Sequence, residues 1–492
     1  MSYILLAAAV VLLVTYIINQ VRKPANFPPG PSWLPFIGNL PELRKLSRAL
    51  GGQYLALIEL AKRYKTNVLG LKLGSEYVVT VFSYPVIKTV LLGDEYDGRP
   101  DNFFMRLRTM GTRRGITCTD GELWKIQRNF VVTHLRSLGF GKKPMEILIK
   151  EEIPELLGVL QQNGSSVRIG KVIAPSVINI LWALTTGSRI DRKDPRLNRL
   201  LDLLELRKNV FDMSGGTLSQ HPWLRFVAPE RTGYNVIQKL NVELKDLLME
   251  TVTQHYKTWT AGASDDLIHS FITEMKNANG HETTFTEEQL VMVCLDIFIA
   301  GAQTTSTTLD FAFLVMILYP DVQSKVHACL DQAFKKSEDV NYSDRVRVPY
   351  IEAVLLEVER YYHVTPITGP RRVLRDTTLE GYSIPKGTTV LISSYSIHHD
   401  KDFWGDPEVF RPDRFLDENG KLLSNERLIP FGLGRRRCLG EILAKHCLFI
   451  FFVELMRRYK LSSLPGMAKP SAIPLPGITL SPEKYTAKFT SR

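Results

Sequence analysis

The first 21 residues of the chain form one uninterrupted apolar run. Met1–Val21 contains no charged residue and is rich in Leu, Ile, Val and Ala. This is about the length that an α-helix needs to cross a bilayer. Arg22 and Lys23 follow directly, so the positive-inside rule predicts a lumenal N-terminus and a cytosolic body. A cleaved signal peptide is the alternative, but the run lacks a basic start and a small-residue cleavage site.

A proline cluster separates this run from the rest of the chain. Phe27-Pro28-Pro29-Gly30-Pro31 makes a stiff, extended connector that cannot continue a helix. We therefore predict three parts: a transmembrane anchor over residues 1–21, a basic and proline-rich hinge over 22–40, and one compact body over 41–492. The body shows no second linker, repeat or low-complexity tract.

Helical spacing dominates the body, and its longest pattern runs from Thr286 to Tyr319. Thr286-Glu287-Glu288-Gln289 resembles a capping box, and Pro320 ends the pattern. The predicted helix would be roughly 50 Å long, enough to cross a domain. Its centre reads Ala300-Gly301-Ala302-Gln303-Thr304-Thr305, where glycine and back-bonding threonines predict a widened turn. Further helices are predicted at Leu123–Val132 and Ile442–Met456.

Strand patterns are few and short. Tyr77–Phe82 has strand character, and Gly381–Ile384 with Thr388–Ile392 predicts a hairpin through Pro385-Lys386-Gly387. The pattern as a whole predicts a mainly α fold with small β-sheets.

Composition narrows the function classes. The formal net charge is +11, but no basic-aromatic repeat or zinc-finger spacing supports nucleic-acid binding. The net positive charge is then consistent with two remaining partners, an anionic membrane surface or an acidic protein. The five cysteines are odd in number and mostly scattered, which indicates a reducing compartment without a disulfide framework. No serine-hydrolase, metalloprotease, P-loop or dinucleotide-binding motif is present.

One cysteine has surroundings that suit a metal ligand. Cys438 follows Phe431, Gly434 and Arg436 and precedes Gly440, directly before the predicted helix at Ile442. A helix N-terminus and nearby arginines are expected to favour the thiolate. The glycines allow the backbone to approach a flat, bulky group, and Phe431 can screen the sulfur from water. These are the properties of a thiolate axial ligand to haem iron.

The pattern Phe-x-x-Gly-x-Arg-x-Cys-x-Gly resembles the haem-binding loop of the cytochrome P450 superfamily, and the resemblance covers essentially the whole chain. It implies a single-pass enzyme of the endoplasmic reticulum membrane, with haem b held by Cys438 between the long central helix and the cysteine-loop helix. It also implies use of O2, with electrons from NADPH through NADPH–cytochrome P450 reductase and in some cases cytochrome b5. Lys125, Arg136, Lys142, Lys143, Arg435 and Lys445 form a candidate basic surface for that partner.

The same resemblance assigns expected roles to further residues. Thr304 stands where the family has the alcohol that hydrogen-bonds dioxygen, beside Gly301 and Thr305, whereas Gln303 replaces the usual acid and cannot titrate. The residues expected to contact the haem are Phe431, Gly434, Arg436, Gly440, Trp124, Arg128, Arg99 and Arg371. Glu357, Arg360 and Arg414 are expected to form a buried structural triad.

The substrate is expected to be lipophilic. Candidate pocket residues are Phe103, Phe104, Ile116, Ile297, Phe298, Ala300, Pro366, Ile367 and Pro474. Ala-Gly-Ala-Gln-Thr-Thr resembles the insect farnesoate and methyl farnesoate epoxidases of juvenile hormone biosynthesis. If the substrate is a free acid, Arg106, Arg108, Arg113 or Arg114 could pair with it.

Other functions remain open at this point. Within the same family the substrate could instead be a steroid, a fatty acid or a xenobiotic. Gln303 also allows a haem-thiolate isomerase or dehydratase that needs no reductase. A membrane-bound lipid or haem carrier without turnover is the non-catalytic alternative.

Overall fold

The computed structural model describes residues 2–162, 166–210, 218–219, 221–262, 265–278, 281–335 and 338–492. Its α-helices are α1 Ser2–Val21, α2 Leu40–Leu50, α3 Gln53–Arg63, α4 Tyr84–Leu92, α5 Phe103–Arg108, α6 Gly121–Ser137, α7 Lys143–Gln162, α8 Ile169–Thr186, α9 Pro195–Val210, α11 Leu224–Val227, α12 Tyr234–Thr258, α13 Leu267–Asn277, α14 Glu287–Leu318, α15 Pro320–Ala333, α16 Pro349–Tyr361, α17 Ser394–His398, α18 Lys401–Trp404 and α19 Glu441–Arg458. Short 3-10 helices are η1 Asp94–Tyr96, η2 Tyr342–Arg347, η3 Pro412–Phe415 and η4 Gly434–Arg436. The strands are β1 Val68–Leu73, β2 Glu76–Val81, β3 Ser166–Val167, β4 Ile367–Arg372, β5 Thr377–Leu379, β6 Tyr382–Ile384, β7 Thr389–Ser393, β8 Tyr459–Ser463 and β9 Ala487–Ser491.

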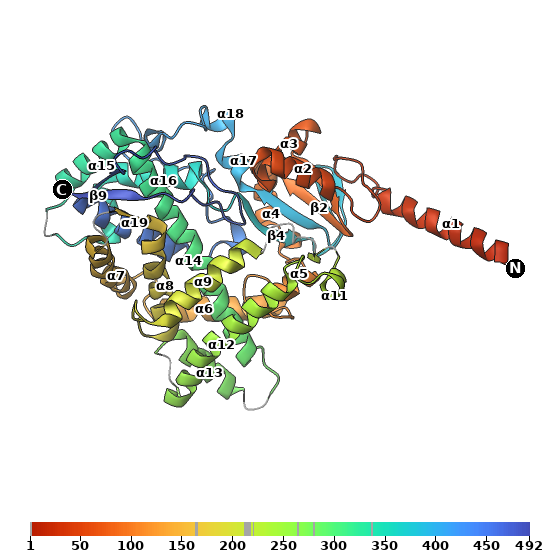
Figure 1. Ribbon diagram of the computed structural model, residues 1–492, viewed down its shortest axis with the longest axis horizontal. Helices are drawn as coiled ribbons and strands as arrows, with labels where there is room; N and C mark the ends of the chain where they lie inside the picture. The colour runs from red at the N-terminus through yellow and green to blue at the C-terminus, as the bar shows by residue number, and fades with distance from the viewer. Residues whose placement is uncertain are drawn as a thin grey trace.

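The mainly helical architecture predicted from the sequence is confirmed. Helices form one broad lobe, the largest sheet and its flanking helices form a second, and α1 projects away from the body on the side of the sheet (Figure 1). Among the described residues, three helices are long and apolar enough to cross a membrane, but Ile169–Thr186 and most of Glu287–Leu318 are buried inside the body. Tyr3–Val21 of α1 is the span whose side chains are uncovered.

Three small sheets form among the described residues. The largest has the order β1-β2-β7-β4, with β2 and β7 parallel and the other pairs antiparallel. The predicted hairpin between β6 and β7 is wrong. β6 pairs instead with β5 through a turn in which Glu380 and Gly381 have φ of 50° and 79°. Positive φ at two central residues is typical of the tight turn that matches strand twist.

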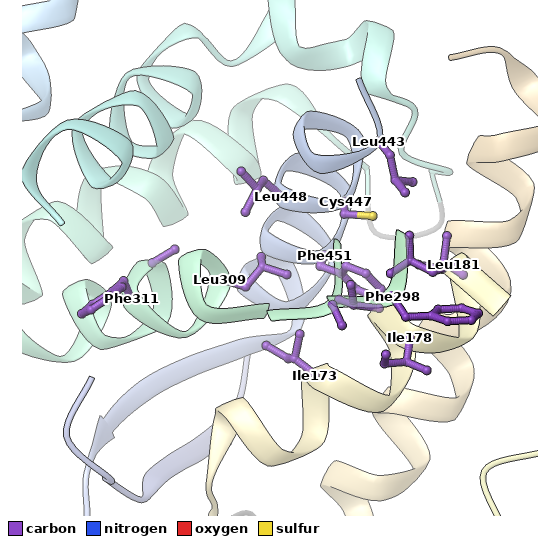
Figure 2. Packing of buried hydrophobic residues seen from close by; sticks show 14 of the residues in the cluster. Ile173, Ile178, Leu181, Phe298, Leu309, Phe311, Leu443, Cys447, Leu448 and Phe451 are labelled. Atoms are coloured by element: carbon purple, nitrogen blue, oxygen red, sulfur yellow. The ribbon is translucent and has the colours of Figure 1, made fainter. Parts of the chain in front are cut away.

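Helix α14 runs through the middle of the main core, as expected for an element that is apolar on almost every side. Figure 2 shows side chains of α8, α14 and α19 meeting in one hydrophobic cluster. The helix begins where the sequence predicted, because Thr286 Oγ1 accepts a hydrogen bond from Gln289 N at 3.2 Å. The Gln289 side chain does not complete a capping box, since it bonds the backbone of Gly115.

A polar cluster joins α8, α12 and α13. Asp266 Oδ2 lies 2.6 Å from His269 Nδ1 and 3.4 Å from His255 Nε2. Asp266 Oδ1 also accepts from the His269 backbone N–H, and His255 Nε2 is 3.2 Å from the carbonyl oxygen of Thr186 at the end of α8. Burial opposes a charge on His255, but these acceptors outweigh it and raise the pKa of His255. The pKa of Asp266 is lowered, because hydrogen bonds and both histidines outweigh its burial.

These shifts predict the sign of a pH effect. A raised histidine pKa contributes stability that is present below its ordinary value of about 6.5 and is lost as the pH rises through the folded value. The lowered pKa of Asp266 contributes stability that is lost only in acid, below about 3.8. We expect His255→Gln to lower the apparent Tm of the full chain at pH 6 by about 1–2 °C more than at pH 8. Thermal unfolding in detergent micelles measures this, and an equal loss at both pH values would contradict it.

Candidate active site

Cys438 lies in a tight loop between η4 and α19. Its backbone N–H donates to the carbonyl oxygen of Phe431 at 2.9 Å, which closes the loop. The backbone N–H groups of Gly440 and Glu441 hydrogen-bond its sulfur. Gly440 is the N-cap of α19, so the sulfur lies beside the N-terminus of an 18-residue helix, as predicted. Cys118, Cys294 and Cys447 are buried, whereas Cys438 has exposed surface.

The protonation of Cys438 differs from the sequence-based expectation. The pKa of its thiol is raised although Cys438 keeps exposed surface, because the protein packed around the sulfur desolvates it, which is the largest influence, and Glu441 adds to it. The N–H groups of Gly440 and Glu441 and the charge of Arg128 lower the pKa of this thiol, but their combined effect is smaller than the effect that raises it. The neighbouring arginines already face other groups: Arg435 pairs with Asp97 at 3.2 Å and Arg437 with Glu441 at 2.6 Å. A bound cation would be needed to hold this sulfur as a thiolate.

Arg99, Arg371 and Arg436 come from three distant segments and gather around Asp97. Arg371 Nη1 is 3.0 Å from Asp97 Oδ1, and Arg436 Nη2 donates to the Asp97 carbonyl oxygen at 2.6 Å. Arg99 Nη1 donates to the carbonyl oxygens of Gly369 and Pro370. Burial, reinforced by the neighbouring guanidinium groups, lowers the pKa of Arg436 to about 9 and that of Arg371 to about 10.

The three arginines around Asp97 carry more positive charge than the single Asp97 carboxylate neutralises. The Nε atoms of Arg99 and Arg371 are buried and make no hydrogen bond within the described chain. Buried guanidinium donors without an acceptor are costly unless an anion completes them. The two propionates of a haem are anions of the kind that such donors bind. The donor set therefore fits the haem that the sequence implies.

Trp124 and Arg128 of α6 lie against the same loop. The guanidinium carbon of Arg436 is 3.8 Å from the centre of the Trp124 ring, a cation–π contact. Arg128 Nη2 donates to the carbonyl oxygen of Arg437 at 2.7 Å. Sequence analysis expected both side chains to face a propionate. The propionate contact stays a prediction, whereas the structure shows Trp124 and Arg128 in contact with Arg436 and Arg437 of the cysteine loop.

One stretch of α14 is open although most of the helix is buried. Ala300 is exposed, and Gly301, Gln303 and Thr304 are partly exposed, whereas Thr305 is buried. Thr304 Oγ1 donates to the carbonyl oxygen of Ala300 at 2.8 Å. The predicted widened turn is wrong, because α14 is regular α-helix from Glu287 to Leu318. Gly301 has a packing function: a Cβ there would lie 2.8 Å from Leu181 of α8.

The glycines of the cysteine loop also serve different purposes. Gly434 has φ of +69°, and a Cβ on it would lie 2.4 Å from the carbonyl oxygen of Leu91. It is therefore required for packing of the loop on α4, not only for approach of a ligand. A Cβ on Gly440 would meet nothing within 4 Å, so this glycine leaves open space beside the sulfur.

The candidate pocket residues separate into two groups. Ala300 is exposed, and Ile297, Pro474 and Phe103 are partly exposed. The remaining residues are buried: Phe104, Ile116, Phe298, Pro366 and Ile367. Phe298 stacks on Trp182 of α8 with ring centroids 5.6 Å apart, so its ring is part of the core cluster, and its place in the pocket stays a prediction.

Asp296 was missed by the sequence analysis, and Gln289 was noticed only as a cap. Asp296 Oδ2 accepts hydrogen bonds from the backbone N–H groups of Ile116 and Thr117 at 2.7 and 2.9 Å. The Gln289 side chain accepts from the Gly115 N–H through Oε1 and donates to the Gly115 carbonyl oxygen through Nε2. Together they fasten loop 115–117 to α14. The available signal was two polar residues seven apart within an otherwise apolar helix, which places both on one face.

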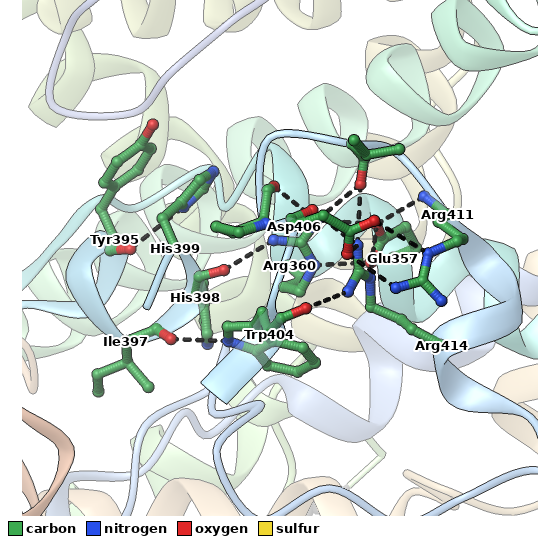
Figure 3. Close-up of polar contacts among 12 residues, drawn as sticks. Glu357, Arg360, Tyr395, Ile397, His398, His399, Trp404, Asp406, Arg411 and Arg414 are labelled. Atoms are coloured by element: carbon green, nitrogen blue, oxygen red, sulfur yellow. Dashed lines mark hydrogen bonds and ion pairs between the residues drawn. The ribbon is translucent and has the colours of Figure 1, made fainter. Parts of the chain in front are cut away.

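Glu357, Arg360 and Arg414 are in direct contact below this region. Arg360 Nε lies 2.7 Å from Glu357 Oε2, and Arg414 Nε lies 3.1 Å from Glu357 Oε1. Figure 3 shows the two guanidinium groups converging on the carboxylate, with their other donors directed at backbone carbonyls. Arg360 Nη1 reaches the carbonyl oxygen of His398 and Arg414 Nη1 that of Trp404. This cluster ties α16 to the segment that leads to the cysteine loop.

Comparisons with known proteins agree with this geometry. The family model described as Cytochrome P450 matches residues 28–489. The chain is 46% identical to the probable cytochrome P450 305a1 of Drosophila melanogaster, over 100% of this chain and 99% of that protein. It is 35% identical to the farnesoate epoxidase of Bombyx mori, over 98% and 97%. It is also 35% identical to cytochrome P450 2J2 of Homo sapiens, over 98% and 94%.

Two structural features accompany this family match: a cysteine sulfur that faces backbone N–H groups at a helix N-terminus, and an arginine cluster that needs an anion. The chain belongs to the cytochrome P450 family and is a haem-thiolate monooxygenase.

Proposed function

We propose that this monooxygenase epoxidises a sesquiterpenoid, with farnesoic acid or methyl farnesoate as substrate, in juvenile hormone biosynthesis. The observation that carries the proposal is the full-length similarity to a farnesoate epoxidase. The Ala300-Gly301-Ala302-Gln303-Thr304-Thr305 segment supports it. The second candidate is a hydroxylase of steroids, fatty acids or xenobiotics. It is favoured by the equal identity to human cytochrome P450 2J2, whose name specifies no substrate.

The side chains described above would hold the haem and control the space beside it. Cys438 would be the iron ligand, with Gly440 and Glu441 N–H groups on its sulfur. Arg99, Arg371 and Arg436 would bind the propionates, with Trp124 and Arg128 supporting them. When bound, the haem activates dioxygen and supplies one oxygen atom to the substrate. Thr304 would place its hydroxyl oxygen at the open face of α14, and its proton would become available there on release from the Ala300 carbonyl oxygen.

Thr304→Ala is expected to reduce coupling between NADPH use and product. The mutation removes the hydroxyl at the open face, and Gln303 can orient water but cannot supply a titratable proton. We expect hydrogen peroxide release per NADPH to rise about threefold or more, because one positioned proton donor contributes roughly two orders of magnitude to a proton transfer. Peroxide and product assays in the reconstituted enzyme measure this. Gln303→Glu is the matched variant and should shift the ratio toward product. Unchanged coupling in Thr304→Ala would remove this residue from proton delivery.

We place the enzyme in the endoplasmic reticulum membrane, with residues 1–21 as a single-pass anchor, 22–40 as the hinge and 41–492 as the cytosolic catalytic domain. The exposed apolar surface of α1 supports the anchor. Trp223, Phe226 and Val227 in and beside α11 are also strongly exposed. Large exposed apolar side chains that lie together are suited to the membrane surface.

Electrons would come from NADPH through the reductase, with cytochrome b5 as a further partner. The basic surface expected for these partners is smaller than the sequence suggested. Lys125 pairs with Glu122, Arg435 with Asp97 and Lys445 with Glu441. Arg136, Lys142 and Lys143 are exposed and remain the candidates for docking an acidic flavoprotein.

The direct test is turnover of defined substrates. The full chain would be reconstituted with reductase, NADPH and either farnesoic acid or methyl farnesoate, and the epoxide measured by mass spectrometry. We expect one epoxide that requires NADPH. Absence of epoxide together with hydroxylation of lauric acid, progesterone or a xenobiotic would overturn the substrate assignment and favour the second candidate. Absence of NADPH-dependent oxidation of every substrate would contradict both.

A further inference from the structure

A cavity of about 370 Å³ lies between α5, α12 and the first two turns of α14. One part of its wall is apolar, with Leu107, Met110, Val242 and Met292 among the lining residues. The other part is charged. Arg106, Arg114 and Lys245 contribute cations, and Glu288 contributes the single carboxylate. The cavity is thus amphipathic, with more positive than negative charge.

Among the described residues, the side chains of Arg114 and Lys245 make no hydrogen bond and no ion pair within 4 Å. Arg106, in contrast, is held by Asp101, with Nε 2.8 Å from Oδ1. The pKa of Glu288 is held below its usual range, mainly because the carboxylate hydrogen-bonds its own backbone N–H. The charges of Arg114 and Lys245 lower this pKa further. The N-terminus of α14 adds further positive potential at this end.

Uncommitted cations beside an apolar wall match one class of ligand. A neutral lipid would leave the excess positive charge of the cavity unmatched, since Glu288 alone faces Arg106, Arg114 and Lys245, and a small hydrophilic anion would gain nothing from Leu107 and Met292. We propose that this cavity binds the carboxylate end of an amphipathic acid, with Arg114 and Lys245 as its counter-charges. This inference rests on the proposed function, because it names the chemical form of the substrate that the site takes.

The position of the cavity along α14 also sets where such an acid would be oxidised. Met292 lines the cavity, and Ala300 and Gln303 lie eight and eleven residues further along the same helix. Both lie within about 80° of Met292 around the helix axis, at distances of about 12 and 16 Å along it. An extended carbon chain advances about 1.3 Å per bond. Oxidation is therefore expected about nine to twelve bonds from the carboxylate, toward the far end of the chain.

The test compares each acid with its methyl ester in the full-length haem-loaded enzyme. Binding would be followed by the ligand-induced change in haem absorbance, using farnesoic acid with methyl farnesoate and lauric acid with methyl laurate. We expect Arg114→Gln with Lys245→Gln to weaken binding of the acids about tenfold or more and of the esters less than about twofold. Arg114→Lys keeps the charge and should restore part of the acid affinity. Lys239→Gln is the control, since Lys239 lies on α12 with its side chain 80% exposed.

The outcomes separate this inference from the proposed function. Ester binding reports whether the double variant keeps its fold and pocket. Equal affinity of the wild-type enzyme for acid and ester, or an equal loss for both in the double variant, would overturn the carboxylate site even if both farnesoids are epoxidised. A selective loss for the acids, combined with no epoxidation of either farnesoid, would support the site and reject the proposed substrate. Oxidation next to the carboxylate would overturn the orientation.

Discussion

Replacing Cys438 with serine is expected to abolish turnover by more than about a hundredfold and to remove the thiolate signature from the carbon monoxide difference spectrum of the reduced protein. Changes to groups that merely orient a metal ligand typically cost 10–100-fold, and this change removes the ligand itself. A serine hydroxyl ionises far less readily than a thiol and is a harder donor. The Gly440 and Glu441 N–H groups, which hydrogen-bond the sulfur, would face a smaller oxygen.

The control is Cys329→Ser, on α15. Cys329 is only partly buried and lies in a helix that contributes nothing to the cysteine loop, so its replacement should leave the spectrum and turnover unchanged. Bound haem would be quantified independently of the spectrum, because the serine variant can retain haem through the arginine cluster. A Cys438→Ser protein that kept the thiolate spectrum would show that another residue is the ligand.

Local signals made some parts of this structure predictable. Helix α14 begins and ends where Thr286 and Pro320 indicated, because capping and proline geometry act within a few residues. The cysteine loop was identified for the same reason, since five spaced residues specify it. The sheet pairing was not predictable in this way. Strand β7 pairs with β2, which lies about three hundred residues earlier, and no local pattern specifies that partner.

The errors at the site have a tertiary origin as well. Helix position and nearby arginines suggested an easily ionised Cys438, but burial of the sulfur is set by surrounding segments and has the larger effect. Gly301 and Gly434 were interpreted as room for chemistry or a ligand, whereas Leu181 and the Leu91 carbonyl require them. Asp296 was missed because its partners, the backbone N–H groups of Ile116 and Thr117, lie about 180 residues earlier in the chain. In each case the deciding contact comes from a residue that is distant in sequence, so a local pattern could not reveal it.

Glu357→Gln is expected to destabilise the folded protein by about 3–5 kcal/mol, the largest stability effect of any single substitution considered for this chain. Glu357 and Arg360 are both fully buried, and Arg414 is 4% exposed at its side chain. An amide keeps the shape of the carboxylate but removes its charge, which leaves the buried Arg360 guanidinium without its carboxylate and Arg414 with Asp406 as its remaining ion-pair partner. Since whole proteins are stable by only about 5–15 kcal/mol, we expect much less folded, haem-containing protein and a lower apparent Tm.

The matched control is Glu408→Gln, because Glu408 forms an ion pair with Lys401 at 2.8 Å on the surface, with side chains 60% and 71% exposed. Losing that pair should change stability by less than about 1 kcal/mol. In both variants one glutamate is replaced by glutamine, so the difference between their apparent Tm values measures how much more the buried carboxylate contributes than the exposed one. If Glu357→Gln proved as stable as Glu408→Gln, the triad would not hold α16 to the segment before the cysteine loop. Loss of haem without loss of Tm would instead mean that the triad positions the loop but does not support the fold.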